Sequence, residues 1–239
     1  MSRPTKAYRN IDFLTGPDAR SIRILCEYLE PLQRLREEQV GRALIFFGSA
    51  RARADGLRSE DYAAARELAR RLARWTVDAH PPEQRFRICT GGGPGIMQAA
   101  HEGAAEIDSA LNVGLNISLP FEQHVNPHVS EALAFEFHYF FMRKLWFANL
   151  AHGVVVFPGG FGTFDELFEL LTLMQTGKLM QVPLVLFGKR FWQRAVDVGL
   201  LAEEGLILPQ DQELFLLTDR IDEAESYLRE RAPAVVRDR

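Results

Sequence analysis

Residues 157–166 read FPGGFGTFDE, and this stretch decides the fold. It follows the apolar run GVVV at 153–156, so the pattern predicts a strand, a glycine-rich turn and a helix. Glycine lets a backbone approach a ligand closely and adopt positive φ. A helix that begins at Thr163 would direct its free N–H groups and positive dipole end toward that ligand. The turn therefore predicts an anion site, most often for phosphate, unless its glycines serve only a tight connection.

Individual residues of this stretch suggest separate roles. Thr163 can cap the helix or donate its hydroxyl to a phosphate. Glu166 lies one turn inside the helix, where a carboxylate can act on the rest of a phosphorylated molecule. Asp165 and Glu166 point about 100° apart on a helix, so they are not a converging acid/base pair. Asp165 is better placed to interact with the helix dipole.

Apolar strands and helices alternate along most of the chain. Strands are predicted over 44–47, 86–90, 112–119, 154–157, 184–187 and 215–217, and helices over 60–79, 96–107, 137–151, 166–176, 191–201 and 222–231. This alternation predicts an α/β fold, a single Rossmann-like domain with a parallel sheet and helices on both faces. We expect an N-terminal arm and helix over 1–40, the domain over 41–231 and a tail over 232–239. Gly48, Gly93 and Gly160 should then meet at the carboxyl edge of the sheet, where such folds bind ligands.

Composition narrows the classes of protein. The 239 residues are 47% apolar and 25% charged, as in an ordinary globular domain. A net charge of −4 argues against nucleic-acid or acidic-membrane partners. No signal-peptide pattern or run of about 18 apolar residues occurs, so a cytoplasmic protein is expected. Cys26 and Cys89 lack metal-ligand spacing, and Pro127 separates His124 from His128, so no metal is expected.

A second glycine-rich turn, GGGPG, occupies residues 91–95 and opens another predicted helix. It lacks the third glycine of a dinucleotide-binding turn, and no acidic residue ends the following strand. No Walker sequence is present either. We therefore expect no cofactor.

Residues 137–147 read FHYFFMRKLWF, which is apolar on nearly every face of a helix and predicts a largely buried one. Arg143 and Lys144 nevertheless stand side by side in it. A buried unpaired charge is costly, so an anionic partner is expected. Arg143 either binds a ligand or joins an internal ion pair, and Lys144 binds the anion or extends to solvent.

Four segments, 46–51, 90–97, 142–144 and 158–166, occur in an order and spacing that resemble the LOG ("lonely guy") family of nucleoside 5′-monophosphate phosphoribohydrolases, many of which carry a lysine decarboxylase label. The resemblance covers about residues 40–220. It implies cleavage of the N-glycosidic bond of a purine nucleoside 5′-monophosphate, either AMP or an N6-substituted AMP, with release of base and ribose 5-phosphate. Asp165 in place of glutamate, Phe161 in place of tyrosine and the long N-terminal segment set the chain apart from the plant enzymes.

The resemblance also implies the site residues. Arg143 and Glu166 correspond to the catalytic pair. The implied substrate-binding residues are Gly48, Ser49, Gly92, Gly93, Glu122, Met142, Lys144, Gly159, Gly160, Phe161, Gly162, Thr163, Asp165 and Thr172. A nucleotide substrate and a homodimer are the expected partners. The main alternative is a non-catalytic carrier of a nucleotide or molybdenum cofactor in the same fold, whereas nothing marks the Schiff-base lysine of a decarboxylase.

Overall fold

The computed structural model describes residues 4–120 and 125–235. Within them, seven parallel strands form one sheet in the order β4-β3-β2-β1-β5-β6-β7, which confirms the predicted Rossmann-like α/β class. The strands are β1 (Ala43–Phe47), β2 (Arg87–Thr90), β3 (Asn112–Ile117), β4 (Ala134–Phe137), β5 (Ala151–Val156), β6 (Leu184–Phe187) and β7 (Leu216–Thr218).

The strand order reverses between β1 and β5, which pair directly from Leu44↔Gly153 to Phe47↔Val156. Side chains alternate across β1 as the period of a strand requires. Ile45 and Phe47 enter the core on one face of the sheet, and Leu44 and Phe46 enter the core on the other. A reversal of this kind opens a crevice at the carboxyl ends of the two strands.

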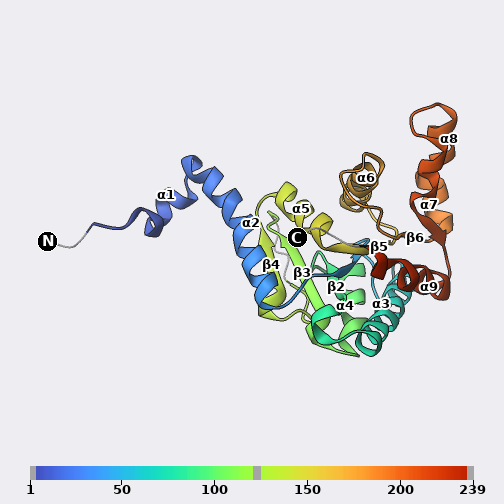
Figure 1. Cartoon of the computed structure of the whole chain (residues 1–239), viewed down its shortest axis with the longest axis horizontal. Coiled ribbons are helices and arrows are strands. Elements are labelled where there is room, and N and C mark those ends of the chain that lie inside the picture. Colours follow the sequence, from blue (N-terminus) through green and yellow to red (C-terminus); the bar gives the residue numbers. More distant parts are fainter. Residues whose placement is uncertain (1–3, 121–124, 236–239) are drawn as a thin grey trace.

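Helices cover both faces of the sheet (Figure 1). One core contains side chains of α2, α5, α6 and α7, and the other contains side chains of α3, α4 and α9. The α-helices are α1 (Ile11–Thr15), α2 (Arg20–Glu37), α3 (Ser59–Ala79), α4 (Ile96–Ala105), α5 (Phe140–Leu150), α6 (Phe161–Gln175), α7 (Lys189–Ala195), α8 (Val198–Glu203) and α9 (Ile221–Arg231).

Element boundaries differ from the prediction around residue 137. The expected helix over 137–151 begins only at Phe140, and the expected loop before it contains the strand β4. Phe137 pairs with Ile117 of β3, so it belongs to the sheet. The strand β4 is short and stands directly before an apolar helix. The change from the two-residue hydrophobic period of a strand to the 3.6-residue period of a helix is therefore hard to see in the sequence. The predicted helix over 191–201 is likewise two helices, because Asp197 accepts a hydrogen bond from the N–H of Leu200 and begins α8.

The prediction that residues 137–147 form a largely buried helix holds for the face of α5 that packs on the sheet and is wrong for another face, which is exposed. Met142, Trp146 and Phe147 are buried in the core. Phe140 and Phe141, at the start of α5, are about half exposed, with 50% and 48% of their surfaces accessible. This helix therefore presents a second, apolar surface away from the sheet.

The N-terminal segment forms helices, and α1 projects away from the sheet (Figure 1). The next helix, α2, packs on the body. Its Tyr28 stacks on Trp146 of α5, with ring centroids 5.8 Å apart. Its Arg34 donates a hydrogen bond of 2.8 Å to the carbonyl oxygen of Ala134 in the edge strand β4. Across the described ranges, none of the helices has the length and apolarity that a bilayer crossing requires.

Candidate active site

The loops that leave β1, β2 and β5 are joined by backbone hydrogen bonds. Ser49, after β1, donates its N–H to the carbonyl of Pro158, 3.1 Å away. The carbonyl of Ser49 accepts the N–H of Ile96, 3.0 Å away, at the start of α4. Gly48, Gly93 and Gly160 thus lie along one carboxyl edge of the sheet, as predicted.

The three glycines of the turn after β5 have different reasons to be glycine. A Cβ on Gly159 would lie 2.0 Å from the hydroxyl oxygen of Thr163, so this position has no room for a side chain. A Cβ on Gly160 or Gly162 would meet nothing within 4 Å, and neither residue has positive φ. Packing and backbone geometry therefore require only Gly159. The other two glycines keep the surface in front of the helix open.

That surface is the N-terminus of α6, which begins at Phe161 rather than at the predicted Thr163. Gly160 is the N-cap residue, and its carbonyl accepts the N–H of Phe164 at 3.1 Å. The N–H groups of the residues between them have no partner within the helix. Thr163 lies in the first turn and does not cap the helix. The turn thus combines free donors, the positive dipole end and open space, which are the requirements of an anion site.

Arg143 of α5 and Glu166 of α6 form an ion pair beside this turn. The Nη2 of Arg143 lies 3.1 Å from the Oε1 of Glu166, and both side chains are mostly buried, with 13% and 7% of their surfaces exposed. The Nε of Arg143 is buried and has no hydrogen-bond partner among the described residues. A Cβ on Gly91 would lie 3.9 Å from the Nη1 of Arg143, so the second glycine-rich turn also adjoins the pair.

Burial dominates the electrostatics of this pair. It raises the pKa of Glu166 to about 7, although the charge of Arg143 acts to lower it. Burial likewise lowers the pKa of Arg143, while Glu166 acts to raise it. An arginine remains protonated in either case. Glu166 is therefore a carboxyl group that can exchange a proton near neutral pH.

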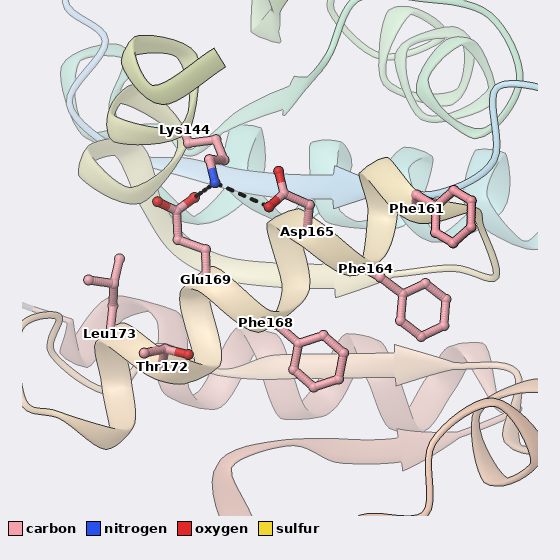
Figure 2. Close-up of a pocket in the computed structure, with 8 residues that line it drawn as sticks. All are labelled: Lys144, Phe161, Phe164, Asp165, Phe168, Glu169, Thr172 and Leu173. Atoms are coloured by element: carbon pink, nitrogen blue, oxygen red, sulfur yellow. Dashed lines mark hydrogen bonds and ion pairs between the residues drawn. The ribbon is translucent and has the colours of Figure 1, made fainter.

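Lys144 of α5 points toward Asp165 and Glu169 of α6 (Figure 2). Its Nζ lies 3.2 Å from Asp165 and 3.4 Å from Glu169. Burial acts to lower the pKa of Lys144, but the bonds to these two carboxylates outweigh it, and the net pKa is raised. These three residues line a groove that also includes Thr172 and the almost fully exposed Phe161. Arg143 and Glu166 are not among its lining residues.

The remaining predicted site residues are distributed around the edge. Gly48 packs against Ile96. The position has no room for a larger residue, because a Cβ there would lie 2.7 Å from the Ile96 side chain. Gly92 has a φ of +70°, and its carbonyl and that of Gly93 accept hydrogen bonds from the Asn126 amide. Met142 is buried in the core. Glu122 lies outside the described residues.

Asn116 is a polar residue of the site edge that the sequence analysis missed. It is 2% exposed, and a Cβ on Gly92 would lie 2.7 Å from its Oδ1. Neither Oδ1 nor Nδ2 has a hydrogen-bond partner within the described ranges. The sequence did contain a signal for it, because an asparagine in the otherwise apolar end of a buried strand is unusual. No group of three or more potential metal ligands occurs in the part of the chain that the structure describes.

The model of the family described as possible lysine decarboxylase matches residues 97–228, more than half of the chain. The chain belongs to this family, the LOG family. The matched part includes Arg143, Glu166 and the turn between them.

Two curated relatives are named as nucleotide-cleaving enzymes. A pyrimidine/purine nucleotide 5′-monophosphate nucleosidase of Escherichia coli is 33% identical over 116 residues, which is 45% of this chain but only 25% of that protein. The chain thus matches about a quarter of the length of this relative. The cytokinin riboside 5′-monophosphate phosphoribohydrolase LOG3 of Arabidopsis thaliana is 26% identical over 84% of this chain and 87% of its own. The X-ray structure of the protein TM1055 shares the fold, with a TM-score of 0.54, 20% identity, and coverage of 79% of this chain and 99% of that one.

The pKa of Glu166 predicts a pH-dependent stability difference between the protein and Glu166→Gln. The folded pKa, about 7, lies above the ordinary value of 4.5, so the folded state holds a proton that the unfolded state releases between these values. The parent protein therefore loses stability as pH rises through this window, and Gln does not titrate. The free energy of unfolding of each protein can be measured with urea at several pH values. Between pH 4.5 and pH 8, the difference between the two proteins should change by on the order of 3 kcal/mol in favour of Glu166→Gln. A difference that is constant with pH would contradict the buried, proton-exchanging carboxyl.

Proposed function

We propose that this protein hydrolyses the N-glycosidic bond of a purine nucleoside 5′-monophosphate, either AMP or an N6-substituted AMP, and releases the base and ribose 5-phosphate. The observation that carries the proposal is the buried pair of Arg143 and Glu166 beside the open N-terminus of α6, where their Nη2 and Oε1 atoms are 3.1 Å apart. Membership of the LOG family and the names of the two relatives support the substrate class.

In this proposal the 5′-phosphate binds the free N–H groups at the start of α6. Gly160 and Gly162 let the phosphate oxygens approach the backbone, because neither position carries a side chain that would cover it. A phosphate held at one end fixes the ribose, so C1′ is brought next to Glu166 without further loss of freedom in the reaction. Binding energy from the phosphate then contributes to cleavage of a bond elsewhere in the molecule.

Glu166 acts on the ribose in its ionised form. As the bond between C1′ and the base breaks, its electrons leave with the base nitrogen and positive charge develops on the ribose. The carboxylate stabilises that charge, accepts a proton from the water that adds to C1′ and passes this proton on to the base nitrogen. A pKa of about 7 suits a group that must accept and return a proton at neutral pH. Arg143 keeps part of the Glu166 population ionised, because its positive charge acts to lower the pKa of that carboxyl.

We also propose that a second copy of the chain covers the outer faces of α5 and α6. Apolar side chains are only partly covered there within the monomer, and Phe161 is 97% exposed. Exposed aromatic surface of this kind is typical of a protein interface. The exposed side chains on the two helices are Phe140, Phe141, Leu145, Phe161 and Phe168.

The phosphate assignment predicts a preference for charged ligands. AMP should bind about tenfold to a hundredfold more tightly than adenosine, because hydrogen bonds to a charged group contribute about 1.5–3 kcal/mol. Isothermal titration calorimetry with the Glu166→Gln protein avoids turnover during the measurement. Ribose 5-phosphate should compete with AMP, and ribose should not. Equal affinities for AMP and adenosine would refute the assignment of this turn as the phosphate-binding site.

The catalytic assignment predicts a large rate loss in Glu166→Gln, which keeps the shape and removes the charge. Release of adenine from saturating AMP, or of base from an N6-substituted AMP, should slow by on the order of a hundredfold or more. Asp165→Asn is the matched control on the same helix and should be mild, since Asp165 is half exposed and pairs with Lys144. A Glu166→Gln protein as fast as the parent would overturn the assignment. Tight AMP binding by a parent that cleaves no nucleotide would favour the carrier alternative.

The dimer proposal predicts twice the chain mass by light scattering. Phe161→Ser should shift the protein toward the monomer, because it removes the most exposed ring of the surface. Leu57→Ser is the matched control, since Leu57 is 63% exposed but belongs to neither α5 nor α6. A parent protein that remains monomeric at micromolar concentration would refute the proposal.

A further inference from the structure

Glu27 of α2 makes three hydrogen bonds to the segment that carries Arg143. Its Oε1 accepts the backbone N–H of His138 at 2.8 Å, and its Oε2 accepts the N–H of Tyr139 at 3.2 Å. Its own backbone carbonyl accepts the indole N–H of Trp146 at 2.9 Å. One residue of the N-terminal helix therefore binds α5 at two places along its length.

These two places lie on either side of Arg143 in the helix. Tyr139 is the N-cap residue of α5, and its carbonyl accepts the N–H of Arg143 at 3.2 Å. Trp146 lies one turn after Arg143, on the same side of the helix. The side chain of Tyr139 does not cap α5, and the Glu27 carboxylate instead holds the backbone of the N-cap residue and of the residue before it. A shift of α5 at either place would move the guanidinium relative to Glu166.

We propose that Glu27 is a positioning residue, which holds α5 in the register that brings Arg143 into contact with Glu166. This proposal rests on the function proposed above. The helix α2, which carries Glu27, then has a role in the reaction, although it lies outside the region that the family model matches. The phosphate turn is on α6, which these hydrogen bonds do not involve. Loss of the Glu27 carboxylate should therefore affect the chemical step more than the binding of the nucleotide.

The pH dependence of the reaction reports on this contact. The groups that act on Glu166 are Arg143 and Lys144 from α5 and Asp165 and Glu169 from α6. The two carboxylates belong to the same helix as Glu166 and remain in place if α5 moves. Withdrawal of Arg143 removes the main influence that lowers the pKa of Glu166. The acidic limb of the rate profile should then move to higher pH.

The experiment compares the full-length parent with Glu27→Gln, Glu27→Ala and Glu37→Gln. Glu37→Gln is the matched control, because Glu37 ends the same helix and its carboxylate accepts a hydrogen bond from the exposed Gln33 of that helix. With AMP as substrate, kcat should fall on the order of tenfold to a hundredfold in Glu27→Ala, since displacements of about 1 Å have effects of this size. Glu27→Gln keeps one acceptor and should lie between Ala and the parent. KM should change little, and the acidic limb should shift upward in pH only in the Glu27 variants.

Two results would overturn the proposal. The first is a pair of Glu27 variants with parental kcat and pH profile, even if their melting temperatures are lower, because a purely structural role would give that pattern. The second result concerns the structural contact and can be measured even if the parent releases no base, an outcome that would refute only the proposed function. If Glu27 holds α5, backbone amides of residues 138–146 should exchange with deuterium faster in Glu27→Ala than in Glu37→Gln. Equal exchange in the two variants would disprove the positioning role.

Discussion

Ser49 donates its N–H to Pro158 and accepts the N–H of Ile96, so the loop after β1 is bonded to the loops after both β5 and β2. The bond to Pro158 bridges the place where the strand order reverses, and the bond to Ile96 joins the neighbouring loop after β2. They require backbone to approach backbone, and a Cβ on Gly95 would lie 2.2 Å from the carbonyl oxygen of Ser49. The site therefore depends on close contact between three loops. Its side chains are arranged around a frame that is itself made of main chain.

The buried ion pair follows from the order of elements around β5. The helix α5 leads into this strand and α6 leaves it, and both pack on the same face of the sheet. Each helix contributes one residue of the buried pair, Arg143 from α5 and Glu166 from α6. Burying two charges costs more than their attraction returns in many proteins, so such a pair is weak evidence for stability and stronger evidence for function. The raised pKa of Glu166 is the direct result of that burial.

Much of this arrangement could be predicted because its signals are local. Residues 157–166 contain a strand end, a turn and a helix start, and their spacing alone places Glu166 one turn beyond the glycines. The edge strand β4 could not be predicted, because its four residues stand against an apolar helix start. Glu27 could not be found either. Its partner His138 is 111 residues away in sequence, and a contact of that separation has no local pattern.

The helix α2 has a further consequence at the edge of the sheet. Arg34 donates hydrogen bonds to the carbonyl of Glu131, just before β4, and to that of Ala134, so α2 occupies one backbone acceptor of β4. At the opposite edge, β7 is only three residues long. Short or covered edges prevent a sheet from adding a strand of another chain. Loss of α2 would free the carbonyl of Ala134 in β4, an acceptor to which a strand of another chain could bond.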